Sequence, residues 1–257
     1  AMTNPVNSIK RGNSRFYVCP KTGTKLKSVT SIINTLSKPF LAPWQAKMVA
    51  TAAADEFGTL AQMLSQGKRE GAIDYFKGAA RRDSAPKSKL GSEVHDLCDR
   101  IAKGEDIKHV HPEHQGHVDL FKQWVSDFNV EFYETEVTVW SDTHGFAGTL
   151  DAIARIEDEV VILDYKTGKS VYADVALQLN AYANADCILD PDGTRRELPE
   201  VEAGAVLHLR ADKAELIPVR LGDDVFDVFK NLIVASEWQT ETHKTVLGQP
   251  ITPTQGN

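Results

Sequence analysis

Apolar residues recur at helical spacing through most of the first half of the chain. Four of them, between positions 90 and 101, fall on one face of a helix predicted over residues 89–103, which Gly104 ends. Other helices are expected at residues 31–36, 44–57, 58–65, 72–82 and 112–127, and Ser28 or Thr30 can cap the first. The polar segment Asp83–Lys89, which contains Pro86, predicts a connector between two helices.

Alternation with period two begins near residue 130 and predicts a β-rich second half. Strands are expected at residues 130–140, 146–156, 160–165, 201–209 and 214–219. The third of these is almost continuously apolar, which is typical of a central strand buried on both faces. Helices are expected at residues 174–188 and 223–240, and a short hairpin near the start pairs Phe16–Val18 with Lys25–Lys27.

This order of elements predicts the α/β (α+β) class, with a mixed central β-sheet flanked by helices and a helical N-terminal section. The 257 residues suit one core with a helical addition. We expect a basic arm and helical section at residues 1–88, a core at residues 89–243 and a flexible tail at residues 244–257.

Charge is distributed unevenly along a chain of ordinary composition. The net charge is -7, yet residues 1–90 hold 15 Lys and Arg against 5 Asp and Glu, so their net charge is +10 and that of the remainder is -17. The asymmetry favours a part that faces nucleic acid, although a solvated helical surface gives the same count. No apolar run reaches the length of a membrane span and no secretory signal opens the sequence, so we expect a cytoplasmic protein.

The segment Gly148–Tyr182 holds the residues with the clearest chemical meaning. Asp151 and Asp164 lie on adjacent predicted strands, and Lys166 shares a strand face with Asp164 because the two are separated by one residue. Carboxylates and a backbone carbonyl suit Mg²⁺, and an ammonium can balance charge on a phosphodiester during hydrolysis. Each short motif occurs by chance, but charges ending an apolar strand are costly unless used or paired. The segment predicts a metal-dependent nuclease.

Three motifs, GTLD, VILDYKTG and QLNAY, together resemble the PD-(D/E)XK nuclease superfamily, specifically its RecB-like exonuclease branch of CRISPR-adaptation and phage exonucleases. The resemblance covers residues 95–182, and residues 28–44 are similar to the N-terminal helices of phage members. It implies a restriction-endonuclease-like fold, Mg²⁺ or Mn²⁺ as cofactor, and DNA as partner.

The resemblance also implies a role for each matching residue. His95, Asp151, Asp164 and the main-chain carbonyl of Tyr165 would hold the metal, and Lys166 would assist the attacking water or the phosphorane. Taken alone, a histidine such as His95, on a helix beside Val94 and Leu97, is usually a side chain at the edge of the core.

Gln178 and Tyr182 match a motif that faces the site in relatives, which implies that they position the strand. They are one helical turn apart and share a face, as a simple packing pair also would. Glu136 lies where relatives often have an acid on the preceding strand and is a secondary candidate.

Basic and aromatic residues of the N-terminal third suggest a surface for single-stranded DNA. We assign nucleic-acid binding to Arg81 and Arg82, and also to Lys169 beyond the third strand. The aromatic residues of this third would either stack on bases or lie in the interior: Phe40, Trp44, Tyr75 and Phe76.

Cysteine and histidine patterns do not predict further metal centres. Cys19, Cys98 and Cys187 are too few for the four-cysteine iron–sulfur cluster of many CRISPR-type relatives, so we expect none, and no disulfide framework. Four histidines between positions 109 and 117 are interpreted as a loop and a solvated helix start.

The sequence therefore predicts a metal-dependent DNA exonuclease acting on single strands or DNA ends, in phage-type recombination, replication or DNA processing. Two alternatives stay open. One is a structure-specific endonuclease, and the other is an inactive nuclease-fold protein that binds DNA. The intact D-x-K motif with both acids favours catalysis over the second alternative.

Overall fold

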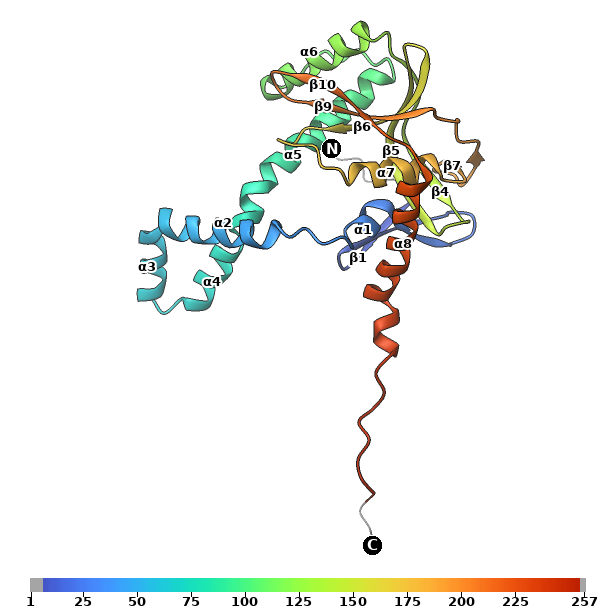
Figure 1. Ribbon diagram of the computed structural model, residues 1–257. Coiled ribbons are helices and arrows are strands. Elements are labelled where there is room, and N and C mark those ends of the chain that lie inside the picture. Colours follow the sequence, from blue (N-terminus) through green and yellow to red (C-terminus); the bar gives the residue numbers. More distant parts are fainter. Residues whose placement is uncertain (1–6, 255–257) are drawn as a thin grey trace.

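Ten strands form one mixed β-sheet in a computed structural model that describes residues 7–254 (Figure 1). The strands are β1 (Ser8–Arg11), β2 (Ser14–Val18), β3 (Lys25–Ser28), β4 (Glu131–Ser141), β5 (Phe146–Ile156), β6 (Glu159–Lys166), β7 (Cys187–Leu189), β8 (Arg195–Arg196), β9 (Ala203–Leu209) and β10 (Ala214–Val219). Most neighbours are antiparallel, but β3 pairs with β5 and β6 pairs with β9 in parallel. The predicted class, a mixed sheet flanked by helices, is confirmed.

The sheet divides at β5. One edge of β5 pairs with β4 along nearly its whole length. On the other edge, β3 pairs with Phe146 and Ala147, whereas β6 pairs with Ala152–Ile156. Between them, residues 148–151 have no strand partner on that edge within the described part of the chain. Asp151 therefore lies at a fork in the sheet.

Helices cover both faces of the sheet. They are α1 (Val29–Ile33), α2 (Leu41–Asp55), α3 (Phe57–Ser65), α4 (Arg69–Lys77), α5 (Ala79–Ala102), α6 (Pro112–Asp127), α7 (Val175–Ala183) and α8 (Asp223–Thr240), followed by a 3₁₀ turn, η1 (Thr242–Thr245). Apolar side chains of α1, α7 and α8 pack on one face, and those of α5 and α6 on the other. None of the helices in residues 7–254 combines the length and apolarity needed to cross a membrane.

The connector predicted at Asp83–Lys89 is wrong, because α5 runs without interruption through Pro86. A proline removes one helical hydrogen bond, but this part of α5 is exposed, so water can satisfy the freed carbonyl. Ala79 and Ala80 before Pro86 and Val94 after it are buried, so packing fixes both halves of the helix. The boundary expected at residue 88 thus falls within one helix.

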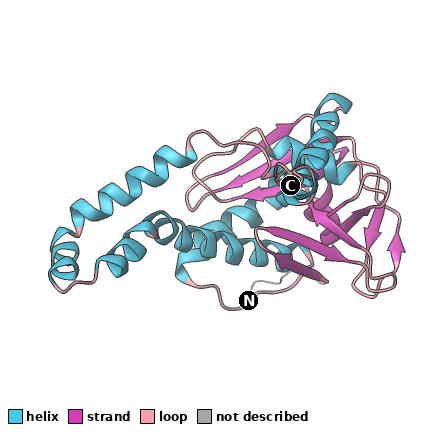
Figure 2. Cartoon of the chain, turned by 90° about the horizontal axis from the view of Figure 1, so that it is seen from below, coloured by secondary structure: helices cyan, strands magenta, loops and turns pink. Residues whose placement is uncertain are grey.

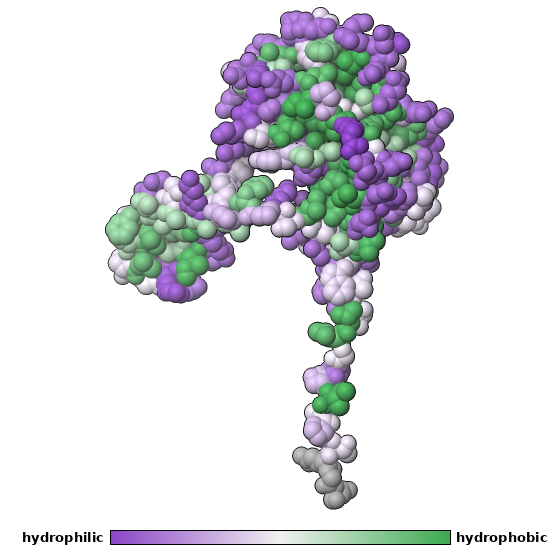
Figure 3. Space-filling view, in the orientation of Figure 1, coloured by the Kyte–Doolittle hydropathy of each residue, from purple (hydrophilic) through white to green (hydrophobic). Residues whose placement is uncertain are grey.

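Helices α2–α4 and the first half of α5 form an arm, which the segment 34–40 and α5 join to the body (Figures 1 and 2). Neither α2 nor α3 contains a buried residue. Apolar side chains gather at the free end of the arm (Figure 3), where Phe57 is 67% exposed. The arm therefore has much less internal packing than the body.

The predicted helix over residues 174–188 is too long. It ends at Ala183, and Cys187–Leu189 instead form β7, which pairs with Thr138–Trp140 of β4. All three residues of β7 are buried, so burial at the sheet edge overrides local helical preference. The predicted N-terminal hairpin is confirmed, since Phe16 pairs with Lys27, and the Ser28 hydroxyl caps α1 by accepting from the N–H of Ser31.

The interpretation of the histidine segment as solvated is wrong for two of its members. His114 and His117 lie one turn apart on the face of α6 that packs on the body, and both are buried. Nε2 of His114 lies 2.8 Å from Oε2 of Glu93 on α5. This contact links α5 to α6 and places a carboxylate beside the buried ring of His114.

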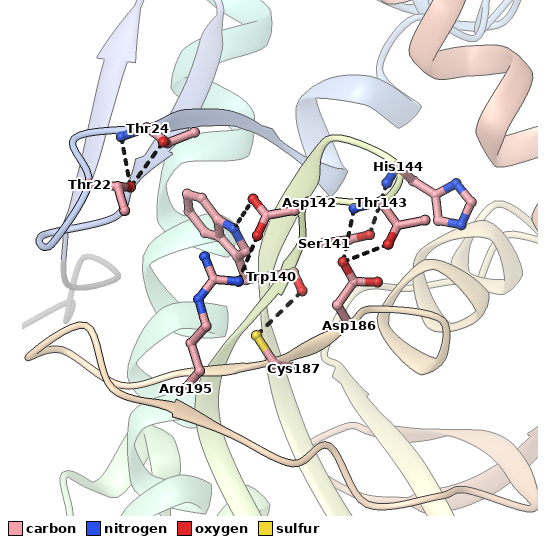
Figure 4. A network of polar contacts seen from close by, with 10 residues as sticks. All are labelled: Thr22, Thr24, Trp140, Ser141, Asp142, Thr143, His144, Asp186, Cys187 and Arg195. Carbon is pink, nitrogen blue, oxygen red and sulfur yellow. Dashed lines mark hydrogen bonds and ion pairs between the residues drawn. The ribbon is translucent and has the colours of Figure 1, made fainter.

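A polar network fastens the β4–β5 turn to Asp186, directly before β7, and to Arg195 of β8 (Figure 4). The indole N–H of buried Trp140 donates to Oδ1 of Asp142, and the guanidinium of Arg195 donates to Oδ2 of the same carboxylate. Asp186 accepts from both the N–H and the hydroxyl of Thr143. These bonds hold the far end of the β4–β5 hairpin, away from the fork.

Phe229 anchors α8 to the strand that carries Asp151. Its ring is fully buried and meets the ring of Phe146 on β5 edge-to-face, with centroids 5.1 Å apart. We predict that Phe229→Ala lowers the free energy of unfolding by about 3–5 kcal/mol, because it opens a cavity. The matched change Val234→Ala, at a position 70% exposed on the same helix, should shift it by less than about 0.5 kcal/mol. Urea denaturation measures both, and equal losses would contradict this packing.

Candidate active site

Six side chains singled out from the sequence converge at the fork in the sheet. They come from four elements: His95 from α5, Asp151 from β5, Asp164 and Lys166 from β6, and Gln178 and Tyr182 from α7. The β5–β6 register, in which Ala152 pairs with Leu163, places Asp151 opposite Asp164. A short turn between the two strands thus brings both acids together.

Asp151 is held from two sides. Its Oδ2 accepts the backbone N–H of Tyr165 at 2.8 Å, and its Oδ1 lies 3.5 Å from Nδ1 of His95. The side chain is 13% exposed. Among the described residues, 148–151 have no strand partner on that edge, so the Asp151 side chain accepts the hydrogen bond that the Tyr165 N–H donates.

Asp164 is buried and surrounded by polar atoms of its neighbours. Its Oδ1 accepts from the amide nitrogen of Gln178 at 3.2 Å, and its Oδ2 lies 2.9 Å from Nζ of Lys166. The second contact is an ion pair without hydrogen-bond geometry, so Oδ2 has no hydrogen-bond partner among the described residues. Lys166 also lies 3.5 Å from the amide oxygen of Gln178. Gln178 therefore contacts both ends of the D-x-K pair.

Tyr182 is buried and acts within the protein rather than at its surface. Its hydroxyl accepts from the Gln178 amide at 3.1 Å, and its ring packs directly on Gly148. A Cβ at Gly148 would lie 2.6 Å from the Tyr182 ring, so only glycine admits this packing. The glycine of the GTLD motif thus has a physical reason. Three residues before Asp151, Gly148 leaves room for the Tyr182 ring, whose hydroxyl contacts Gln178.

Burial and mutual repulsion split the acidities of the two carboxyl groups. Burial and the nearby charge of Asp151 raise the pKa of Asp164 to about 7, although Lys166 opposes the rise. Burial alone would raise the pKa of Asp151 too, but His95 and the Tyr165 N–H hold it below its ordinary value. Asp151 is therefore the acid that stays ionised, and Asp164 is the one that takes up a proton more readily.

Two cations balance this acidic pair. Burial lowers the pKa of His95, but the carboxylate of Asp151 outweighs burial and raises it to about 9. Burial also lowers the pKa of Lys166, but the carboxylate of Asp164 outweighs burial and raises that pKa above its ordinary value. At neutral pH the site thus holds an imidazolium and an ammonium beside its carboxylates.

Glu136 lies beside the same acids, at the rim of a cavity of about 330 Å³ that His95, Asp99 and Asp151 also line. It adopts a left-handed backbone conformation, with φ of 49°, which is unusual for a non-glycine residue in a strand. Burial, followed by the charge of Asp151, raises its pKa to about 7. The secondary candidate is thus part of the site's surroundings.

A second cavity, of about 320 Å³, opens on the other side of the cluster and is lined by Lys166, Gln178, Lys38 and Tyr172. Lys38 and Asn34 also line a larger cavity of about 920 Å³ beyond it. The cluster therefore opens toward the segment that leads to the arm. Sequence reasoning did not assign Lys38 or Tyr172, because only the tertiary fold brings residues 134 positions apart to one cavity.

The predicted nucleic-acid contacts do not join the cluster. Arg81 and Arg82 belong to the arm, and the helical rise places Arg82 about 20 Å along α5 from His95. The Arg82 guanidinium lies 4.1 Å from the centroid of the Tyr75 ring. Lys169 is exposed in the segment after β6.

The aromatic residues of the N-terminal third divide between the two expected environments. Phe76 is buried, whereas Phe40 is 55% exposed and Tyr75 is 37% exposed. Phe40 and Tyr75 are therefore accessible for stacking, whereas Phe76 belongs to the interior of the arm.

The donor set suits a hard divalent cation, although its side chains are not arranged around one. Within residues 7–254, no three His, Cys, Asp or Glu side chains are already placed to hold a metal ion. Nevertheless, a buried carboxylate oxygen of Asp164 lacks a hydrogen-bond partner, and the ionised Asp151 lies opposite. Two carboxylates and one imidazole are ligands that Mg²⁺ and Mn²⁺ accept. A cation would require His95 and Lys166 to release their carboxylate partners.

Comparisons with known proteins do not assign a family. No family model and no curated protein matches the chain. A solved structure titled "Crystal structure of SSO0001" matches over 91% of this chain and 80% of its own length, with 15% identity and a TM-score of 0.39. A similarity at that level carries no argument about this protein.

The acidity of His95 provides a direct check on the site. The Asp151 carboxylate raises the pKa of His95 from the ordinary 6.5 to about 9. The contact between His95 and Asp151 therefore stabilises the fold fully below pH 6.5, and this contribution is lost as pH rises through about 9. We predict that Asp151→Asn lowers the pKa of His95 by at least about one unit. NMR titration of the imidazole without metal measures it, with Asp142→Asn as the control. An unchanged pKa in Asp151→Asn would contradict the contact.

Proposed function

We propose that this protein is a metal-dependent deoxyribonuclease of the PD-(D/E)XK type that removes nucleotides from single-stranded DNA or DNA ends. The observation that carries the proposal is the convergence of Asp151, Asp164 and Lys166 at one fork in the sheet, with Gln178 bonded to both members of the D-x-K pair. Such a cluster of buried charge is costly to maintain and is typical of sites that use it.

Each side chain has a distinct part in the proposed reaction. Asp151 and Asp164 would hold the divalent cation together with His95, and the carbonyl of Tyr165 would be a further ligand. When bound, Mg²⁺ or Mn²⁺ would supply Lewis-acid chemistry at the scissile phosphate and the attacking water. The ammonium of Lys166 lies at the rim of the cavity and balances charge that develops on the phosphate.

Gln178 and Tyr182 are positioning residues. Gln178 fixes the separation of Asp164 and Lys166 by donating to one and lying beside the other. Tyr182, buried against Gly148, accepts from the same amide and holds its orientation. Glu136 is placed to accept a proton or a second cation at the opposite rim, since burial keeps its pKa near neutrality.

Exonuclease action is favoured over cleavage within a strand by the position of the arm. Asn34 and Lys38, in the segment that leads to the arm, line the 320 Å³ cavity beside Lys166. A free end enters such a partly enclosed site more readily than a closed circle. A structure-specific endonuclease is the alternative within the same chemistry, and an inactive DNA-binding protein is the alternative outside it. The cytoplasmic location, phage-type setting and lack of an iron–sulfur cluster remain predictions.

The proposal predicts metal-dependent loss of label from end-labelled DNA. Incubation with Mn²⁺ or Mg²⁺ should degrade linear single strands, EDTA should stop it, and Lys166→Ala should lower the rate by about 100-fold or more, because a transition-state charge loses its partner. Gel analysis of the products over time gives the rate and the direction of digestion. Lys122→Ala, at an exposed lysine of α6, is the matched control and should retain full activity.

Closed circular single strands separate the two nuclease alternatives, because only an endonuclease cuts them. Absence of turnover on every linear and circular substrate, in the presence of DNA binding, would refute the enzymatic proposal and leave the binding protein.

A further inference from the structure

An aromatic pair, one ring of which lines the cavity beside Lys166, joins two distant segments of the chain. Phe40, at the start of the arm, and Tyr172, in the segment between β6 and α7, stack with ring centroids 5.9 Å apart and planes 15° from parallel. Phe40 is 55% exposed and Tyr172 is 60% exposed. Tyr172 also lines the 320 Å³ cavity, together with Lys166 and Gln178. Stacking covers one face of each ring and leaves large apolar area in water beside charged groups.

A cation accompanies the pair. Nζ of Lys38, two residues before Phe40, lies 4.0 Å from Oδ2 of Asp174, two residues after Tyr172. At that distance the ion pair is weak, and the Lys38 side chain is 42% exposed. Lys38 and Lys166 line the same cavity, so two ammonium groups border the path between the aromatic pair and the acids.

We propose that Phe40 and Tyr172 form a stacking platform for an unpaired base of the substrate strand, with Lys38 contacting the adjoining phosphate. This rests on the proposed function and specifies its substrate: single-stranded nucleic acid with exposed base faces. An aromatic face next to a positively charged groove is the arrangement that binds single strands without sequence preference. In a duplex, neighbouring base pairs cover those faces, so the platform engages only unpaired nucleotides.

A purely structural role is the competing explanation. The same two contacts, Phe40 with Tyr172 and Lys38 with Asp174, join the arm segment to the segment after β6 and would serve as a clasp. Three features favour a ligand over a clasp. Both rings remain more than half exposed, the ion pair is long, and the pair adjoins a cavity that contains candidate catalytic groups.

The test measures binding with EDTA present, so that no strand is cut. A short fluorescent single-stranded oligodeoxynucleotide is compared with a strand of equal length whose sugars lack bases, by fluorescence anisotropy. We expect Phe40→Ala and Tyr172→Ala each to weaken binding of the base-bearing strand about 5-fold or more, and to leave binding of the abasic strand unchanged. Tyr172→Phe, which keeps the ring, should bind both strands as the wild type does.

Phe57→Ala is the matched control, because Phe57 is an even more exposed aromatic residue at the far end of the arm. It should change neither affinity. Lys38→Gln should weaken binding of both strands equally. It should also reduce the slope of the salt dependence by the amount that corresponds to about one phosphate contact.

Equal losses on the two strands, or no loss in Phe40→Ala and Tyr172→Ala, would overturn the platform and leave the clasp. Failure of the platform and failure of the nuclease proposal give different results. Base-dependent binding by a protein that cuts nothing would refute the enzyme and keep the platform, whereas cleavage with unaltered binding by both variants would refute the platform alone.

Discussion

Burial of two carboxyl groups opposite one another is the constraint to which the rest of the site responds. Asp151 and Asp164 face each other across β5 and β6, where water is largely excluded and like charges repel. The protein balances them with His95 and Lys166 and with a backbone N–H, and it raises the pKa of Asp164 to about 7. Because His95 and Lys166 already balance the two carboxylates, a divalent cation could bind in their place.

The fork in the sheet makes this arrangement possible. Between the part of β5 that pairs with β3 and the part that pairs with β6, residues 148–151 have no strand partner on that edge within residues 7–254. Tyr182 occupies the space over Gly148, and the Tyr165 N–H reaches Asp151. α8 and α5 pack on opposite faces of the same strands, so the apolar core lies behind the acids, whereas the segment that leads to the loosely packed arm lines the cavity on their open side.

Local pattern was sufficient to predict that Asp151 lies near the D-x-K pair and that Gln178 and Tyr182 share a face, because a short turn joins β5 to β6 and one helical turn relates Gln178 to Tyr182. Where tertiary burial decides the structure, local pattern failed. It predicted a break in α5 at Pro86 and a continuation of α7 into the buried strand β7. It also predicted that His114 is solvated, although His114 is buried beside Glu93 of another helix. Contacts between distant segments, such as Phe40 with Tyr172, have no signature in either segment alone.

Metal binding to the metal-free protein tests the central claim most directly, because it does not depend on turnover. Titration calorimetry with Mn²⁺ at neutral pH, in two buffers of different ionisation enthalpy, reports affinity and proton release together. The account predicts saturable binding with release of protons, since His95 and Asp164 give up protons to become ligands, and loss of that binding in Asp151→Asn and Asp164→Asn. Absence of binding by the wild type, or wild-type binding by both variants, would contradict it.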